Sequence, residues 1–239
     1  MSAEKVHTSA TADAAPTAPP LPAASPASPG EAALRRRLLE VLSEPLPPGR
    51  MTYEEFLAWA DEDTLAEWVD GEVIVTSPAS LQHQTVAGFL LQLVSLAVEA
   101  WQLGVVIPPP FQMKLQRSGR EPDLIYLARE HLDRLRPTYL DGPADLVVEI
   151  VSPESVGRDR GEKFTEYEAA GIPEYWLVDP QRRWAEFYRL EGERYRLAFQ
   201  GAEGRYDSAV LPGFWLRVEW LWQDPLPPVL DVLRQLGVI

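Results

Sequence analysis

Residues 145–151 read Asp-Leu-Val-Val-Glu-Ile-Val, an apolar and β-branched run that predicts a buried strand. Glu149 lies in the middle of this run. An ionised carboxylate in such a place costs several kcal/mol unless another group compensates its charge. We therefore expect Glu149 to have a partner, and the two candidates are a metal ion and the arginine of a structural ion pair.

A second carboxylate and a lysine accompany Glu149 in the chain. Asp123 lies near the start of another strand-like run, residues 121–127, and Lys163 follows the Glu149 strand on a predicted helix. Two carboxylates and one lysine, in the order Asp, Glu, Lys, suggest a metal-dependent phosphodiesterase site. Taken singly, however, a proline followed by an aspartate is also common in turns, and Lys163 alone would suit an exposed helix position.

The composition limits the kind of metal that the chain can hold. Of the 239 residues, 46% are hydrophobic, so residues 50–239 can bury one core, and we expect a single domain there. Because the chain has no cysteine, thiolate zinc sites and disulfides are excluded, and any metal must bind oxygen or imidazole ligands. Mg²⁺ or Mn²⁺ fits such ligands best.

The net charge of −14 argues against a broad basic surface for nucleic acid. A local arginine cluster can still bind phosphates, and the candidates are Arg117, Arg120, Arg158, Arg160, Arg182 and Arg183. No apolar run approaches the roughly 20 residues that span a bilayer, and the N-terminus lacks the pattern of a secretory signal. We therefore expect a cytoplasmic protein without a membrane segment.

The chain divides into an arm and a folded domain. Residues 1–49 are rich in alanine and proline, which predicts a disordered arm that carries a short helix over residues 31–42. The domain is expected to begin with a helix near residue 52, because Thr52 and Glu55 match a capping box.

Within the domain, strand and helix patterns alternate. A two-residue β-hairpin is predicted around Asp70-Gly71, followed by a long helix over residues 80–100. The further predictions are strands at 105–107, 111–115, 121–127, 145–151 and 174–178, helices at 130–135 and 160–170, a hairpin at 185–197 and a final helix at 228–236. This order implies an α/β or α+β fold, in which helices flank a mixed β-sheet.

The motifs in this order resemble the PD-(D/E)XK, or restriction-endonuclease-like, superfamily, and within it the Uma-two endonucleases, a domain-of-unknown-function family. The resemblance runs from about Thr52 to Trp222 and rests on Asp70-Gly71-Glu72, Ser77-Pro78, His83, Pro122-Asp123, the segment 148–153, Asp159 with Lys163 and Tyr167, and the segment 171–180. It implies a core of αβββαβ order with added N-terminal and C-terminal β-hairpins. It also implies a metal-dependent endonuclease that cuts DNA, and a homodimer.

The resemblance implies a role for each candidate residue. Asp123, Glu149 and Lys163 would be catalytic, and Asp123, Glu149 and the Ile150 carbonyl would hold Mg²⁺ or Mn²⁺. His83 could contact the metal or a phosphate, or could instead be a capping or core residue. Glu67 and Glu72 could be accessory acids or plain hairpin residues, and Asp159 and Tyr167 are the other accessory candidates.

One departure from the superfamily pattern concerns the lysine. In the superfamily pattern a lysine is expected two residues after Glu149, where this chain has Val151. In the Uma-two group the lysine lies on the following helix instead, and Lys163 matches that position. Asp159, Lys163 and Tyr167 are spaced i, i+4 and i+8, so they are expected on one helical face.

Two other functions stay open at this point. A catalytically silent relative could use the same fold to bind protein or nucleic acid, which the acidic charge favours. An interaction protein could use the N-terminal arm and its Arg35-Arg36-Arg37.

Overall fold

The computed structural model describes residues 50–60, 64–75 and 79–239. These residues belong to one compact unit, Pro47–Ile239. The predicted arm over residues 1–49, its helix and the Ser77-Pro78 pair therefore lie outside the described residues.

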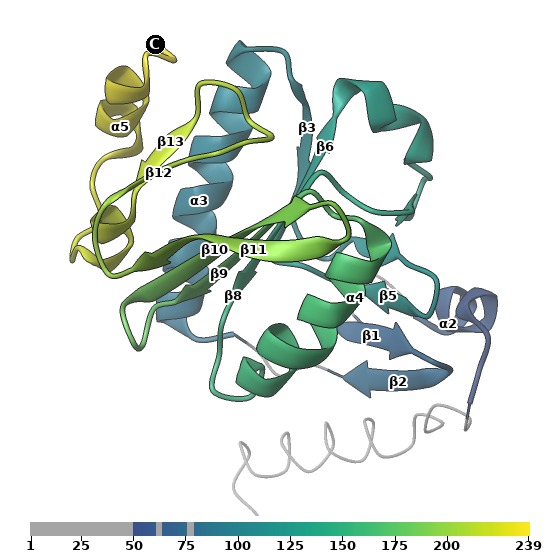
Figure 1. Ribbon diagram of the computed structural model, residues 1–239. Coiled ribbons are helices and arrows are strands. Elements are labelled where there is room, and N and C mark those ends of the chain that lie inside the picture. Colours follow the sequence, from purple (N-terminus) through teal and green to yellow (C-terminus); the bar gives the residue numbers. More distant parts are fainter. Residues whose placement is uncertain (1–49, 61–63, 76–78) are drawn as a thin grey trace, which may run out of the picture. The chain divides into compact units, whose positions relative to one another are not determined.

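The larger of two main sheets contains the strand on which Glu149 lies. Its order is β11-β10-β9-β8-β6-β3 (Figure 1). The strands are β3 (Gly104–Ile107), β6 (Leu124–Ala128), β8 (Leu146–Ile150), β9 (Glu174–Asp179), β10 (Trp184–Glu191) and β11 (Arg194–Gly201). Strands β8 and β9 pair in parallel, while the other neighbours are antiparallel, so the sheet is mixed as predicted.

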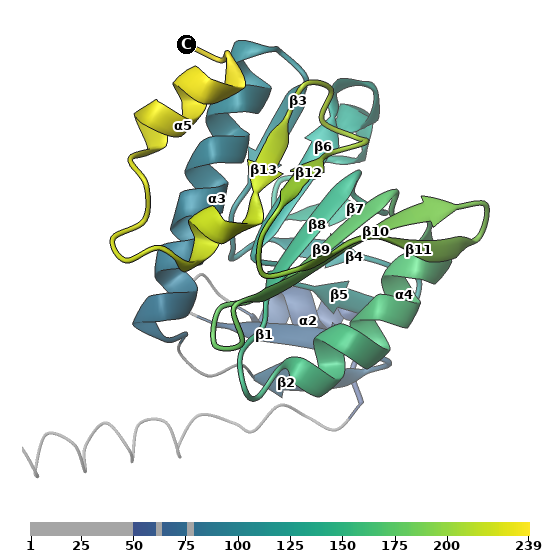
Figure 2. The ribbon, with the colours of Figure 1, turned by 60° about the vertical axis from the view of Figure 1, so that its left-hand side comes forward.

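The two faces of this sheet pack against different helices. Alternate residues of β8, such as Val148 and Ile150, belong to the same core as the buried face of α3 (Leu81–Ala100). The intervening residues, such as Val147, face a second core that contains Tyr167 of α4 (Lys163–Ala170). Because side chains alternate along a strand, Glu149 points to the α4 face. Figure 2 shows α3 and α4 on opposite sides of the sheet.

A smaller sheet carries the N-terminal hairpin. Its order is β2-β1-β5-β4-β7, with β1 (Ala66–Val69), β2 (Glu72–Val75), β4 (Gln112–Lys114), β5 (Ser118–Arg120) and β7 (Tyr139–Asp141). Helix α2 (Tyr53–Trp59) packs its Tyr53 and Phe56 with Ala66 of β1. The predicted capping box is confirmed, because Thr52 and Glu55 bond reciprocally at the start of α2.

Helix α3 corrects one expectation from the sequence. By length and composition alone this helix could cross a membrane, although no such run was expected. Val86, Leu90, Leu93 and Val94 are buried against the sheet, as in the core helix of a folded domain. Ser80 caps the helix by accepting a bond from the backbone amide of His83.

The C-terminal part covers the α3 face of the large sheet. Strands β12 (Arg205–Asp207) and β13 (Trp215–Arg217) pair with each other, and α5 (Val229–Leu236) packs near α3. Short helical turns complete the described elements: 3-10 turns at Arg129–Arg134 and Val218–Trp222, and a π-helical turn at Arg158–Glu162.

The predicted fold class is confirmed, with mixed sheets flanked by helices. The division into two sheets was not predicted, because β5 and β7 have only three residues each and carry no clear periodicity. The three prolines after β3 mark the point where the chain leaves one sheet for the other, and β3 is an edge strand.

Candidate functional site

Two neighbouring strands bring Asp123 and Glu149 together. Leu124 of β6 pairs with Val148 of β8 in antiparallel register, so the next step places Asp123 opposite Glu149 on the same face. The backbone amide of Ile150 donates a hydrogen bond of 2.7 Å to Oδ2 of Asp123. This bond fixes the carboxylate of Asp123 beside the end of β8.

The buried carboxylate of Glu149 accepts two bonds at the same oxygen. Lys163 Nζ donates to Oε1 over 3.0 Å, and the hydroxyl of Tyr167 donates to Oε1 over 2.7 Å. Burial raises the pKa of Glu149 to about 8, and the nearby charges of Asp159 and Asp123 add to this shift, while Lys163 opposes it. The ionised form of Glu149 is therefore destabilised by its surroundings, and a cation beside the carboxylate would favour that form.

Lys163 begins α4, and its ammonium lies between three carboxylates. Nζ is 2.9 Å from Oε1 of Glu67, 3.0 Å from Oε1 of Glu149 and 3.7 Å from Oδ1 of Asp159. Burial alone would lower the pKa of Lys163, but Glu149 and Glu67 outweigh it, so its pKa is raised and the group carries a positive charge. The lysine predicted to have moved from the strand to the helix does reach Glu149.

Asp159 and Tyr167 lie on the same helical face as Lys163, as the spacing predicted. Asp159 accepts a hydrogen bond from the hydroxyl of Ser155, and the hydroxyl of Tyr175 donates to its backbone carbonyl. Burial raises the pKa of Asp159, although Lys163 offsets part of this effect. Asp159 therefore belongs to the surroundings of Lys163.

His83 faces Asp123 from the first turn of α3. Its Nε2 is 3.4 Å from Oδ2 of Asp123. Burial alone would lower the pKa of His83, but Asp123 and the backbone of Ile150 outweigh this effect, so its pKa is raised. The imidazole thus lies beside Asp123, which was predicted to hold a metal. The helix is capped by Ser80 and not by His83.

The two candidate acids of the N-terminal hairpin have different surroundings. Glu67 is 2% exposed and contacts Lys163, so it belongs to the network. Glu72 is exposed, and its carboxylate is 3.8 Å from the guanidinium of Arg50. The structure does not bring Glu72 to the site.

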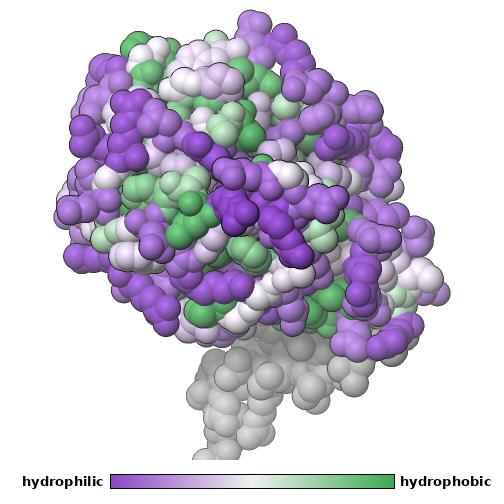
Figure 3. All heavy atoms as spheres, in the orientation of Figure 1, coloured by the Kyte–Doolittle hydropathy of each residue, from purple (hydrophilic) through white to green (hydrophobic). Residues whose placement is uncertain are grey.

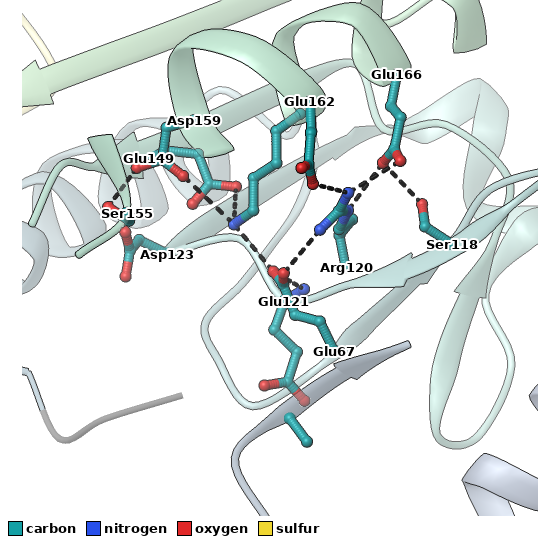
Figure 4. Close-up of polar contacts among 12 residues, drawn as sticks. Glu67, Ser118, Arg120, Glu121, Asp123, Glu149, Ser155, Asp159, Glu162 and Glu166 are labelled. Atoms are coloured by element: carbon teal, nitrogen blue, oxygen red, sulfur yellow. Dashed lines mark hydrogen bonds and ion pairs between the residues drawn. The ribbon is translucent and has the colours of Figure 1, made fainter. Parts of the chain in front are cut away.

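Arg120 is a residue that sequence reasoning misjudged. It was a candidate for a surface arginine cluster, but its side chain is 0% exposed and bonds to Glu67 and Glu166 (Figure 4). Arg117 pairs with Asp70, and Arg160 pairs with Glu186. The six arginines therefore do not form one phosphate-binding patch.

Glu121 was also missed, although it lies two residues before Asp123. Its Oε1 accepts a hydrogen bond of 2.6 Å from the amide of Gln112. Burial raises the pKa of Glu121 to about 7, and the charge of Glu67 adds to the shift, whereas the bond from Gln112 opposes it. The one signal in the sequence for a role of Glu121 was its position close to Asp123.

Two cavities border residues that surround the candidate site. One of about 500 Å³ is lined by residues that include Lys114, Arg117 and Glu166, and another of about 350 Å³ includes Phe56 and Glu121. Neither is lined by Asp123, Glu149 or Lys163, so cavity size is no guide to the chemistry here.

The donor set fits a hard divalent cation held by few protein groups. Among the described residues, no three histidine, aspartate or glutamate side chains form a ready-made ligand cage. Mg²⁺ rarely uses such a cage: it binds one or two carboxylates and keeps several water molecules. Asp123 and Glu149 supply two carboxylates on one face, and their polar contacts within the described chain involve only Oδ2 and Oε1. The pair therefore fits Mg²⁺ or Mn²⁺.

Comparisons with known proteins bear on the family and the fold. The Uma2 family model, described as "Putative restriction endonuclease", matches residues 53–219. A crystal structure described as that of a "putative nuclease belonging to DUF820" from Anabaena variabilis ATCC 29413 is similar, with a TM-score of 0.63 and 15% sequence identity. The match covers 72% of this chain and 97% of the other, and at this identity it shows a shared fold. A search of curated proteins found no match.

Proposed function

The chain belongs to the Uma2 family of restriction-endonuclease-like proteins, and on this premise we propose that it is a metal-dependent endonuclease that hydrolyses phosphodiester bonds of DNA. The observation that supports the proposal most strongly is the meeting of three groups. Asp123 and Glu149 share one face of the sheet, and Lys163 lies 3.0 Å from Glu149. Two acids can hold a metal ion that activates water, and a buried ammonium can stabilise the charge that develops during phosphodiester hydrolysis.

Asp123, Glu149 and the carbonyl of Ile150 are the groups that would hold Mg²⁺ or Mn²⁺. When bound, the ion supplies Lewis-acid polarisation of the phosphate and a lower pKa for a coordinated water. Glu149 must be ionised to act as a ligand, and the raised pKa of its carboxyl makes this ionisation dependent on a nearby cation.

Lys163 supplies a fixed positive charge for the transition state. In the proposed reaction, a water oxygen attacks phosphorus and gives up one proton to solvent, the bond from phosphorus to the leaving sugar oxygen breaks, and the leaving oxygen takes up a proton from solvent. Negative charge grows on the phosphoryl oxygens during the attack, and the ammonium of Lys163 stabilises it while it orients the water. The neighbouring acids keep this ammonium charged, because Glu149 and Glu67 raise the pKa of Lys163 against the opposing effect of burial.

A catalytically silent relative of the nuclease fold is the second candidate. The net charge of −14 supports it, because phosphate backbones are repelled by an acidic surface. Such a protein would bind a protein or nucleic-acid partner through the same fold. The face drawn in Figure 3 is mostly hydrophilic, with apolar residues in small separate patches, so it does not itself favour an apolar partner. The homodimer and the cytoplasmic location stay predictions.

DNA cleavage by matched variants tests the proposal. Plasmid and linear DNA are incubated with wild type, Asp123→Asn, Glu149→Gln and Lys163→Met in Mg²⁺ or Mn²⁺. Glu168→Gln is the control, because it removes one charge from the same helix at a residue that pairs with Arg194. We expect cleavage by wild type and the control, and losses of about a thousandfold in the other variants. Equal cleavage by Asp123→Asn and wild type, or no cleavage by wild type, contradicts the proposal.

A further inference from the structure

The N-terminal hairpin contributes a carboxylate to the surroundings of Lys163. Glu67 lies on β1 of the smaller sheet, whereas Glu149 lies on β8 of the larger sheet and Lys163 on α4. The ammonium of Lys163 is 2.9 Å from Oε1 of Glu67 and 3.0 Å from Oε1 of Glu149. The lysine is therefore held between two acids that come from different sheets.

Both oxygens of Glu67 are already engaged. Oε1 contacts Lys163 and accepts a hydrogen bond of 3.2 Å from the backbone amide of Glu121. Oε2 accepts a hydrogen bond of 3.0 Å from Arg120. Because Glu67 is 2% exposed and its oxygens face two cations, it is poorly placed to take a metal ion. Its surroundings suit a group that holds Lys163.

Arg120 fixes Glu67 in turn. Its Nε and Nη2 bond to the two oxygens of Glu166 over 2.8 and 2.9 Å, a paired arrangement that sets the orientation of the guanidinium. Ser118 donates a further bond of 3.0 Å to Glu166. Figure 4 shows these contacts as one connected set that runs from Glu166 through Arg120 to Glu67.

We propose that Glu67 is a positioning residue that holds the ammonium of Lys163 at the site, and that Arg120 fixes Glu67 for this purpose. The inference rests on the proposed function. A lysine on a helix has a long, flexible stem, whereas a lysine on the Glu149 strand would be positioned by the sheet itself. A metal ion bound to Glu149 would share the charge of that carboxylate, and Glu67 would then be the nearer of the two other acids beside Lys163, at 2.9 Å against 3.7 Å for Asp159.

A double-mutant cycle separates positioning from a general structural role. We expect Glu67→Gln to lower kcat for DNA cleavage about 10- to 100-fold per folded molecule, with KM changed less than about twofold. In the Lys163→Met background, Glu67→Gln should then change the remaining kcat less than about twofold, because the group through which it acts is gone. Glu67→Asp should restore part of the rate. Full additivity of the two losses overturns the inference.

Metal affinity distinguishes positioning from metal ligation. Mn²⁺ titrated into Glu67→Gln should bind with the wild-type affinity, within about threefold, because the described contacts of Glu67 are with Lys163, Arg120 and a backbone amide. A loss of tenfold or more, which the ligands of a metal site and the groups that hold those ligands both give, would place Glu67 in the metal site and overturn the inference. Glu168→Gln, which makes the same change of charge away from Lys163, is the control.

A third readout needs no catalytic activity. The chain has lysine only at Lys5, Lys114 and Lys163, so protein labelled with ε-¹³C lysine gives few signals, which substitution by arginine assigns. We expect Glu67→Gln to shift the Lys163 signal and to broaden it, and Glu168→Gln to leave it unchanged. An unchanged Lys163 signal in Glu67→Gln contradicts the inference. If wild type cleaves no DNA, the proposed function fails, and this signal still decides whether Glu67 holds Lys163.

Discussion

Glu149 and Glu174 are buried glutamates on the neighbouring parallel strands β8 and β9, yet their surroundings differ completely. Glu149 is 4% exposed and Glu174 is 0% exposed. Glu149 faces α4, while Glu174 lies on the side of Trp176 and the C-terminal strands. Burial is therefore common to both residues, and the difference between them lies in their hydrogen-bond donors.

Glu174 is surrounded by neutral donors at both of its oxygens. Oε1 accepts bonds from Trp176 Nε1 over 2.7 Å and from the Tyr206 hydroxyl over 2.8 Å. Oε2 accepts bonds from Ser208 and from the backbone amides of Ala209 and Val210. These bonds join the C-terminal segment to the large sheet, so the carboxylate acts as a structural link.

Within the described part of the chain, Glu149 accepts hydrogen bonds from Tyr167 and Lys163 only, both at Oε1. The pKa of its carboxyl is raised to about 8 by burial and by neighbouring acids. The comparison teaches that a buried acid in a strand does not by itself indicate a functional site. An acid with few donors, other acids nearby and a lysine beside it does indicate one.

The largest expected effect is the loss of DNA cleavage when Glu149 is substituted. Glu149→Gln should lower DNA cleavage about a thousandfold, because the variant loses a charged metal ligand. Its free energy of unfolding should change little, since a carboxyl whose ionised form is destabilised by burial is replaced by a neutral amide of the same shape. Cleavage assays and urea unfolding measure the two quantities. A large loss of stability with full activity per folded molecule would reverse the roles of the two glutamates.

The second prediction concerns stability. Glu174→Gln should lower the free energy of unfolding by about 3 kcal/mol, because an amide leaves some of the buried donors around Glu174 without an acceptor. Activity per folded molecule should stay near that of wild type. Urea unfolding followed by tryptophan fluorescence measures the change, and a loss below about 1 kcal/mol contradicts the structural role.

The pH dependence of stability sharpens the contrast further. The pKa of Glu149 is about 8 in the folded protein, above its ordinary value of 4.5, so the folded state binds this proton more tightly than the unfolded state. The stabilisation is present below about pH 4.5 and is lost as the pH rises through 8. In metal-free buffer, wild type should therefore lose more stability over this range than Glu149→Gln. Equal slopes for the two proteins would show that Glu149 has an ordinary pKa.

The smallest expected effects come from two matched tyrosines. Tyr167→Phe removes the hydroxyl that bonds to Glu149, and Tyr206→Phe removes the hydroxyl that bonds to Glu174. We expect Tyr206→Phe to lower stability by about 1 kcal/mol without changing activity, whereas Tyr167→Phe should also change the rate of cleavage. If both variants affect only stability, Tyr167 is a structural residue.

Much of the fold could be predicted because local patterns determine it. The hairpin at Asp70-Gly71, the long helix α3 and the helix that carries Lys163 follow from turn residues, caps and periodicity. Strands β5 and β7 could not be predicted, since three residues show no periodicity and their pairing depends on distant partners.

The core of the candidate site and several supporting groups were predicted, but Arg120 and Glu121 were not predicted as parts of it. The proximity of Asp123, Glu149 and Lys163 follows from neighbouring strands and the next helix. The burial of Arg120 depends on contacts with Glu67 of β1 and Glu166 of α4, which lie far away in the sequence, so the local sequence does not encode it. Glu67 and Glu72 looked equivalent in the sequence, and strand register decides that only Glu67 reaches Lys163.

Calorimetric titration of Mn²⁺ tests the central claim, that Glu149 belongs to a metal site and Glu174 to the framework. Wild type, Glu149→Gln and Tyr206→Phe are compared at the same pH, because Tyr206→Phe changes the contacts of Glu174 and Arg189 and leaves those of Glu149 in place. We expect saturable heat from wild type and Tyr206→Phe, and none from Glu149→Gln. Wild-type binding of Mn²⁺ by Glu149→Gln would contradict the account.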